Sequence, residues 1–468
     1  MAKSLVFRIV VLLVTPWLLA GADWTRFRGP EGTGVSPEKG LPDALDPARN
    51  AVWSAKVPSG MSSPVVAGGR VFLTGHEGDE RLVLCLDAST GKSLWRRSVR
   101  KMREEAFNKV HGPATPTPVL DRSRLFVFFP DTGLLAFDLA GRELWRHSLG
   151  PFRSVQGLAA SPIAADGRIV VLVDTPEQAY LMAFEAGSGR QVWRTERPTG
   201  VLGGYSTPAV FHRTGQPSEI IVAGARELTG YRTDTGQRLW WAADLTSYPI
   251  ASPFVVGDSV YTLEPAGVNW PPFSQPLGLF DADKDGQVTL KEAEKDPSWL
   301  GSLLGIDLHA GNGDGVVTAE EYRRGTSGEA GGMYRIRLGA RGDIRSSVVW
   351  RHTKGLPELA SALHYEGVLY TIRSGIVSAF DPANGRLMRQ DRLKDALGDY
   401  YASPVAGDGK IYLISLEGMA TVLKAGADWK VLATNDLGEQ VLASPAIAGG
   451  RIYVRTQGTL LCFRRQVR

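Results

Sequence analysis

The stretch that decides the fold is residues 85–95, which read Cys-Leu-Asp-Ala-Ser-Thr-Gly-Lys-Ser-Leu-Trp. Asp87 can bond the backbone of the turn that follows it, and Gly91 can adopt the positive φ that such a turn needs. Trp95 falls on the strand after the turn. The pattern therefore predicts a hairpin whose second strand offers a large apolar ring to a neighbouring unit.

The same hairpin recurs along the chain, and other features recur with it. A serine or threonine, usually followed by proline, precedes a short β-rich run in each unit, and the spacing is 41–54 residues except for one step of 109. Four short strands per unit at this period are typical of a β-propeller, because one unit cannot bury both of its faces alone. The serines and threonines are Ser63, Thr117, Ser161, Thr207, Ser252, Ser361, Ser403 and Ser444.

The eighth unit holds only about three strands before the chain ends. The missing strand is found near the N-terminus, in Ala51-Val52-Trp53-Ser54, which carries the expected tryptophan. We therefore predict an all-β, eight-bladed propeller closed by the N-terminal strand, an arrangement that removes exposed strand edges.

The repeat resembles the pyrroloquinoline-quinone-like propeller family. The tryptophan-docking pattern of that family is Ala-x-Asp-x-x-x-Gly-x-x-x-Trp, and residues 85–95 match it with Cys85 in place of alanine. The second unit is one residue short, and Arg232 replaces the aspartate of the fourth unit. The resemblance spans residues 51–463 apart from an insertion, and it implies the fold more strongly than the function.

The first 22 residues have the features of a signal peptide. Lys3 and Arg8 accompany a short apolar run over residues 9–19, and Ala20-Gly21-Ala22 provides a small-residue cleavage site before Asp23. An uncleaved N-terminal anchor is the alternative, whereas the absence of a cysteine after the run argues against a lipid anchor. We expect a periplasmic or secreted monomer with no membrane span after cleavage.

Charge and cysteine content narrow the function classes further. Removing the two basic residues of the signal peptide lowers the formal net charge from +4 to +2, which argues against a nucleic-acid partner.

Cys85 and Cys462 occupy the same place in two repeats. Equivalent strands of neighbouring blades are usually too far apart for a disulfide, so we expect two buried free thiols.

The long step in the repeat contains a calcium-loop pattern in residues 281–292. A hard cation needs several oxygen ligands on one flexible loop, and this loop places them at the spacing of an EF-hand, with Gly286 at the sharp turn. A solvated acidic turn is the alternative. The predicted ligands are Asp281, Asp283, Asp285, the carbonyl of Gln287, Thr289 or a water, and Glu292.

A second loop over residues 310–321 resembles an EF-hand less fully. Ala310 supplies no carboxylate at the first position, so we expect weaker calcium binding, helped by Asp307 or by water. Val288 and Val317 could pair the two loops through a short β-bridge. The predicted ligands are Asn312, Asp314, the carbonyl of Val316, Thr318 and Glu321.

The predicted organisation is a signal peptide (1–22), an N-terminal extension (23–50), a first ring segment (51–266), the EF-hand insertion (267–331) and a second ring segment (332–468). The insertion leaves blade 5 between its second and third strands. Loops at this place share a face with the connections between blades, so we expect the calcium module at the mouth of the central funnel.

Two function classes fit an exported propeller. The first is a non-catalytic protein that binds an envelope protein, peptide or glycan on its funnel face, similar to the propeller subunit of the outer-membrane β-barrel assembly machinery. The second is a quinoprotein dehydrogenase using pyrroloquinoline quinone and calcium; the resemblance then implies two adjacent cysteines, which this chain lacks. Six residues near the predicted funnel could line a ligand site or be satisfied polar groups: His111, His364, Tyr205, Tyr248, Tyr400 and Tyr401.

Overall fold

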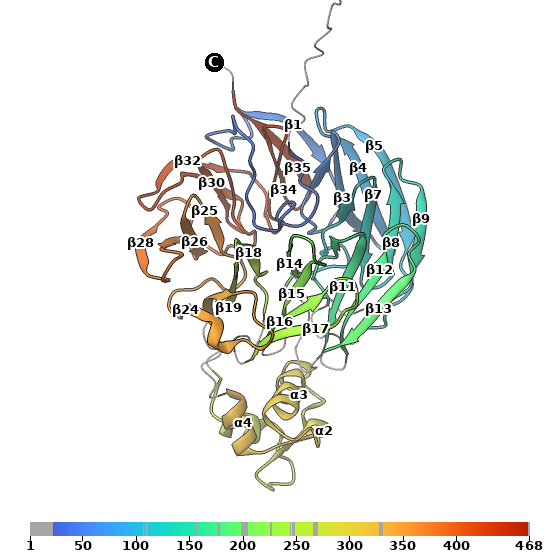
Figure 1. The fold of residues 1–468 in the computed structure, drawn as a ribbon, viewed down its shortest axis with the longest axis vertical. Helices are drawn as coiled ribbons and strands as arrows, with labels where there is room; N and C mark the ends of the chain where they lie inside the picture. Colours follow the sequence, from blue (N-terminus) through green and yellow to red (C-terminus); the bar gives the residue numbers. More distant parts are fainter. Residues whose placement is uncertain are drawn as a thin grey trace, which may run out of the picture.

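The blades follow the sequence repeat and surround a central axis, with their first strands innermost (Figure 1). The computed structural model describes residues 22–466 except 106, 108–110, 153, 155–156, 176–177, 198–204, 225–226, 244, 246–248, 265–269 and 327–330, and the side chains of 297, 308–310 and 324. Residues 1–21 of the predicted signal peptide and Tyr248 lie outside this description. The described residues form eight blades of antiparallel strands, as predicted.

The strands of the first four blades have the following bounds. Blade 1 contains β2 (Val65–Ala67), β3 (Arg70–Glu77), β4 (Glu80–Asp87) and β5 (Ser93–Arg100); blade 2 contains β6 (Val119–Asp121), β7 (Arg124–Phe129), β8 (Gly133–Asp138) and β9 (Glu143–His147); blade 3 contains β10 (Ile163–Ala165), β11 (Arg168–Asp174), β12 (Ala179–Glu185) and β13 (Gln191–Glu196); blade 4 contains β14 (Ala209–Phe211), β15 (Glu219–Gly224), β16 (Glu227–Arg232) and β17 (Arg238–Ala243).

The remaining four blades have these bounds. Blade 5 contains β18 (Phe254–Val256), β19 (Ser259–Glu264), β22 (Gly332–Arg337) and β24 (Val348–His352); blade 6 contains β25 (Leu363–Tyr365), β26 (Val368–Arg373), β27 (Ile376–Phe380) and β28 (Leu387–Arg392); blade 7 contains β29 (Val405–Gly407), β30 (Lys410–Ile414), β31 (Met419–Lys424) and β32 (Lys430–Asp436); blade 8 contains β33 (Ala446–Ala448), β34 (Arg451–Arg455), β35 (Thr459–Arg464) and β1 (Ala51–Lys56).

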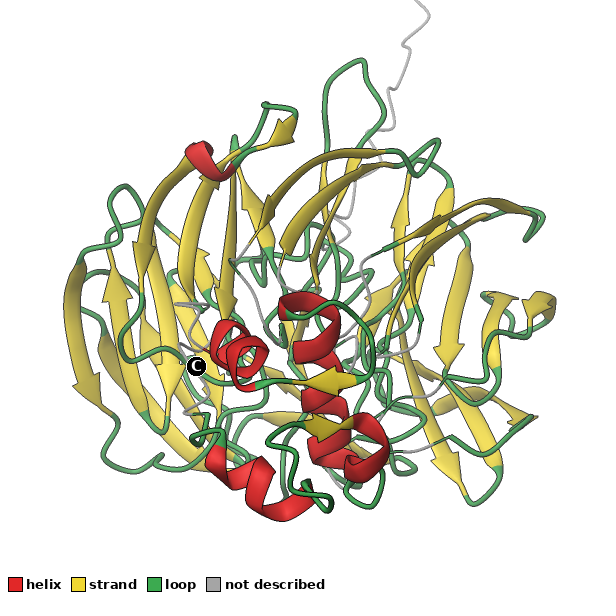
Figure 2. Ribbon diagram, turned by 90° about the horizontal axis from the view of Figure 1, so that it is seen from below, coloured by secondary structure: helices red, strands yellow, loops and turns green. Residues whose placement is uncertain are grey.

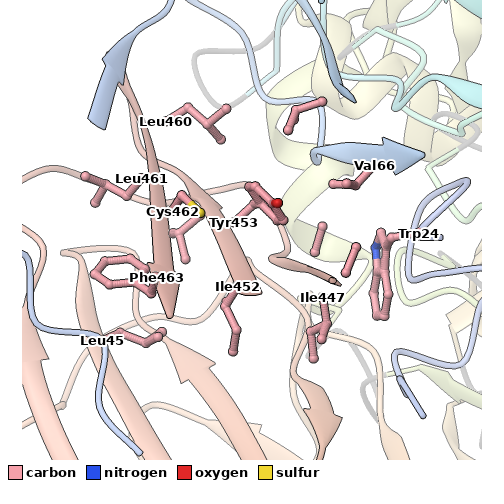
Figure 3. Packing of buried hydrophobic residues seen from close by; sticks show 14 of the residues in the cluster. Trp24, Leu45, Val66, Ile447, Ile452, Tyr453, Leu460, Leu461, Cys462 and Phe463 are labelled. Carbon is pink, nitrogen blue, oxygen red and sulfur yellow. The ribbon is translucent and has the colours of Figure 1, made fainter. Parts of the chain in front are cut away.

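The N-terminal strand closes the ring. β1 pairs antiparallel with β35, placing Trp53 opposite Cys462, so the last blade gains its fourth strand from the other end of the chain. Figure 3 shows the apolar cluster at this closure, where Cys462 and Phe463 lie near Tyr453 and where Trp24 lies near Val66 and Ile447. The predicted closure is confirmed.

Five blade interfaces use the repeat's tryptophan and glycine together. Trp95 of blade 1 lies against Gly141 of blade 2, and its Nε1 donates to the Leu139 carbonyl at 2.9 Å. A Cβ on Gly141 would lie 2.8 Å from the Trp95 ring, so this glycine provides a flat receiving surface as well as a positive φ of 82°. The equivalent pairs are Trp53 with Gly91, Trp145 with Gly189, Trp193 with Gly236, and Trp350 with Gly385.

The interface between blades 4 and 5 departs from this arrangement. Trp240 lies across Gly230 of its own blade, and its Nε1 donates to Glu219 Oε2 at 2.8 Å. The connection from β22 to β24 is long and carries β23 (Gly342–Asp343) and η1 (Arg345–Ser347). β23 pairs in parallel with β17, so an added edge strand joins the two blades where the tryptophan does not.

The insertion between β19 and β22 has its own small core. It contains α1 (Ser274–Phe280), β20 (Val288–Thr289), α2 (Leu290–Ala293), α3 (Pro297–Ala310), β21 (Val316–Val317) and α4 (Ala319–Thr326). β20 and β21 pair antiparallel with Val288 opposite Val317, which is the predicted bridge (Figure 2). Phe280, Leu303 and Tyr322 lie in a hydrophobic cluster formed only by insertion residues.

The insertion does not stand over the funnel mouth as expected. Figure 1 shows α2, α3 and α4 beyond the rim of the ring, on the side of β16, β17 and β24. Topology fixes the face at which β19 ends and β22 begins, but it does not fix where a module with its own core lies relative to the ring.

Both cysteines are buried free thiols, as predicted. Burial raises the pKa of each thiol to about 12, because the thiolate would lose its hydration inside the blades. Among the described helices, none combines the length and the apolar character that a membrane crossing would require.

Candidate functional site

Polar side chains from every blade meet at the ring axis. They are the serines and threonines of the sequence repeat, and they line a central chamber as a collar of hydroxyl groups. Within the collar, the backbone N–H of one blade donates to the hydroxyl oxygen of the next; Ser63 N to Thr117 Oγ1 and Thr117 N to Ser161 Oγ are both 2.9 Å. Seven such links are described around the ring. These hydrogen bonds hold the repeated serines and threonines in place around the ring axis.

A second, mainly apolar ring lies beside the collar. Each of its members precedes a collar residue by two positions and therefore lies nearer to the connections between blades. The chamber that the two rings enclose has a volume of about 340 Å³. The members are Met61, Thr115, Ala159, Tyr205, Ile250, Leu359, Tyr401 and Leu442.

The N-terminal extension covers the other end of the chamber. Trp24 exchanges backbone hydrogen bonds with Val66 of blade 1, and Thr25 O accepts from Leu120 of blade 2. Arg28 reaches the Ala362 carbonyl before blade 6 at 2.7 Å, so the segment crosses the axis. Phe27 lines the chamber. The repeat pattern gave no signal for this crossing, because residues 23–50 carry no repeat.

Three of the six funnel residues meet at the chamber. His111 stacks on Tyr205 with ring centroids 5.4 Å apart, and Tyr401 lines the opposite part of the wall. His111 Nδ1 is buried with no hydrogen-bond partner among the described atoms, and burial lowers the pKa of this imidazole. The chamber wall is therefore partly aromatic, and it includes a histidine whose Nδ1 has no hydrogen-bond partner among the described atoms.

The other described funnel residues do not reach the chamber. Tyr400 is buried and donates to the Ala396 carbonyl at 2.7 Å. His364 lies beside Tyr261, with centroids 5.8 Å apart. Tyr400 thus has a hydrogen-bond partner outside the chamber, and His364 is packed beside an aromatic ring.

The first predicted metal loop gathers its carboxylates. Single oxygens of Asp281, Asp283 and Asp285 lie within 4.8 Å of one another. Asp281 accepts from the backbone of Gly286 at 3.1 Å, and Gly286 has a φ of 83°. Glu292 Oε2 accepts from Thr289 N at 2.8 Å, and Gln287 N donates to Asp285 at 2.8 Å. Backbone N–H groups of Thr289 and Ala282 lower the pKa of Glu292.

The second loop repeats several backbone bonds of the first loop, with Asp307 in the role of Asp281. Asp307, in the last turns of α3, accepts from Gly315 N at 3.0 Å, as Asp281 accepts from Gly286. Thr318 N donates to Glu321 at 2.9 Å, as Thr289 donates to Glu292. Asn312 and Asp314 bond each other, and Val316 N donates to Asp314. Asp307 thus takes the place left empty by Ala310.

Burial distinguishes the two loops. Asp307 is 1% exposed and Glu321 is 7% exposed, whereas the three aspartates of the first loop are more accessible. Buried carboxylates are costly unless a cation or hydrogen bonds compensate them. The sequence signal that identifies Asp307 is its distance of eight residues from Gly315, which the standard loop spacing does not include.

Comparisons with known proteins agree with this architecture. A family model described as outer membrane protein assembly factor BamB matches residues 39–151, 130–268 and 346–466. The chain is 26% identical over 166 residues to the outer membrane protein assembly factor BamB of Nitrosomonas eutropha, an alignment that covers 33% of this chain and 37% of that protein. The chain thus spans well under half the length of this curated relative.

Solved structures show the same fold at low identity. BamB from Moraxella catarrhalis superposes with a TM-score of 0.53 and 12% identity over 88% of this chain and 98% of that one. Quinohemoprotein alcohol dehydrogenase from Comamonas testosteroni gives a TM-score of 0.62 and 12% identity over 95% and 81%. The family model covers more than half of the chain, and its matches fall on both sides of the insertion. The chain therefore belongs to the family described as outer membrane protein assembly factor BamB.

Proposed function

We propose that this protein is exported and acts in the cell envelope as a non-catalytic binding scaffold. The observation that carries the proposal is the family membership, because the family's description concerns outer membrane protein assembly. An assembly role requires recognition of an envelope protein, and a closed propeller is a scaffold that presents loops on one face for that purpose. Peptides and glycans are alternative ligands of the same face.

Two exposed apolar side chains mark a contact surface on the face that carries the connections between blades. Met102 follows β5 and is 55% exposed, and Leu397 follows β28 and is 49% exposed. Most other large exposed apolar side chains of the ring lie on outermost strands, for example Leu144 on β9. Exposed apolar residues on loops favour a protein interface.

The test is affinity capture from an envelope extract with the mature protein, residues 23–468. We expect mass spectrometry to identify a component of the outer-membrane assembly machinery. Met102→Glu and Leu397→Glu should reduce its recovery about tenfold, whereas Leu144→Glu on the outer edge should not. Recovery of no envelope protein above background, or equal recovery with all three variants, would contradict the proposal.

Calcium binding by the insertion is the second part of the proposal. The converging carboxylates of the first loop and the placement of Asp307 in the second support it. Oxygen ligands on flexible loops suit calcium, and the β20–β21 bridge holds the two loops side by side. We propose that both loops bind calcium, and that the module is loaded after export.

The residues that line the axial chamber and the positions of the two cysteines do not favour the quinoprotein alternative. Pyrroloquinoline quinone would be bound together with a calcium ion, yet no aspartate or glutamate that could hold the ion is among the described residues that line the axial chamber. Cys85 and Cys462 lie in blades 1 and 8 and are not adjacent. The chamber's residues therefore do not fit that cofactor, and we assign no reaction to it.

A further inference from the structure

We propose that the axial chamber binds a small monocarboxylate, with the carboxylate held by the hydroxyl collar and an apolar body against the second ring. The collar supplies hydrogen-bond donors, two unpaired arginines beside it supply positive charge, and the second ring supplies apolar contact. This site is distinct from the loop face that we assign to a protein partner.

The collar hydroxyls have donor capacity to spare. In seven links, a hydroxyl oxygen already accepts from a neighbouring backbone N–H, for instance Ser161 Oγ from Thr117 N at 2.9 Å. A serine or threonine hydroxyl also carries one proton to donate. Because the hydroxyls line the chamber, these protons can converge on an acceptor at the axis. Donors of this kind favour a carboxylate over a cation.

The two arginines are fully buried without a carboxylate partner among the described residues. Arg28 and Arg455 are each 1% exposed, and burial lowers the pKa of each guanidinium to about 9, so both remain charged at neutral pH. Two other buried guanidinium groups do have a carboxylate partner. Arg81 lies 2.5 Å from Asp131, and Arg197 lies 3.0 Å from Asp174.

Both unpaired arginines are tied to neighbours of the collar. Arg28 donates to the carbonyl of Ala362, next to Ser361, at 2.7 Å. Arg455 donates to Ser62, next to Ser63, with Nη1 2.7 Å from the hydroxyl oxygen. Each also keeps buried nitrogen atoms without a partner: Nε in both residues and Nη1 in Arg28. Two uncompensated charges in a poorly hydrated interior make the potential at the axis positive.

The wall above the collar determines the rest of the ligand. Leu359, Ile250 and Leu442 are apolar, and the stacked His111 and Tyr205 add aromatic surface. A chamber of about 340 Å³ is at the small end of ligand cavities. One carboxylate on a short aromatic or aliphatic body matches both the polarity and the size.

The experiment titrates the mature protein with 3-phenylpropanoate and, separately, with its uncharged amide, by calorimetry. We expect the acid to bind at least about tenfold more tightly than the amide, since hydrogen bonds to a charged acceptor are the stronger ones. Arg28→Met and Arg455→Met should each weaken binding of the acid while leaving the weak amide binding unchanged. Equal affinity for acid and amide, or no heat from either at millimolar concentration, overturns the proposal.

Collar variants keep the test decisive if an arginine variant fails to fold. Ser161→Ala removes one collar hydroxyl and should weaken acid binding on the order of fivefold. Ser206→Ala is the matched control, because Ser206 donates to the Ala251 carbonyl and does not line the chamber. Leu359→Trp should fill the chamber and abolish binding. An equal effect of Ser161→Ala and Ser206→Ala, or full binding by Leu359→Trp, also overturns it.

Discussion

In the ring, Trp95 of blade 1 lies against Gly141 of blade 2, and four further blade pairs make the same contact. In the insertion, Phe280, Leu303 and Tyr322 lie only against residues of the insertion itself. A blade thus depends on its neighbours, whereas the calcium module depends on its own small core. Damage to a ring contact should therefore affect the whole ring, and damage to a metal loop should remain local.

The largest loss of stability is expected when a contact between two blades of the ring is broken. Gly141→Ala places a Cβ 2.8 Å from the Trp95 ring at a φ of 82°, so we expect a loss of about 2–4 kcal/mol in the free energy of unfolding of the ring. Gly167→Ala is the control, because its φ is 73° with no atom within 4 Å of the added Cβ; about 1 kcal/mol is expected. Denaturant titration measures both. Similar losses in the two variants would mean that the tryptophan contact is unimportant.

The next effect is confined to the insertion. Asp281→Asn and Asp307→Asn each remove charge from an expected calcium ligand, so calcium affinity of the corresponding loop should fall by an order of magnitude or more. The melting temperature of the ring should not change. Asp296→Asn serves as the control, since Asp296 caps α3 and lies in neither loop. If Asp307→Asn leaves calorimetric calcium binding intact, the second loop is not completed by Asp307.

The smallest effect concerns acid stability at the ring closure. Glu439 accepts hydrogen bonds from Thr456, Gly458 and Thr459 and pairs with Lys56 of β1, and these contacts lower its pKa from 4.5 to about 2. A depressed carboxyl pKa stabilises the fold above about pH 4.5, and this contribution is lost as the pH falls towards 2. Glu439→Gln should therefore lower the melting temperature slightly at pH 7, with the difference from the parent disappearing near pH 2. A difference that is the same at both pH values would exclude this linkage.

The sequence predicts the ring well because its signals are local. The glycine and tryptophan of each hairpin, the eight axial serines and threonines, and the strand containing Trp53 are all read from spacing within one unit. The spacing does not show which residue of the next blade each of these residues contacts. That Gly141 receives Trp95, or that Ser161 accepts from Thr117, becomes visible only when the blades are placed side by side.

The candidate sites were predicted less completely. The loop spacing gives Asp307 no more than a helping role, because this residue lies three residues before the standard first position of its loop. Phe27 and Arg28 belong to a segment without periodicity, so their place at the axis depends on tertiary contacts alone. The outward direction of the insertion likewise depends on packing that no local motif encodes.

Deleting the insertion tests the separation of ring and module most directly. Residues 267–330 would be replaced by a short Gly/Ser turn between β19 and β22, and the purified variant would be followed by calorimetry with and without calcium. We predict a cooperative unfolding transition within a few degrees of that of the full chain, no calcium-dependent shift, and no calcium binding. A variant that cannot fold even at low temperature would contradict the account, because the insertion would then be part of the ring's own core.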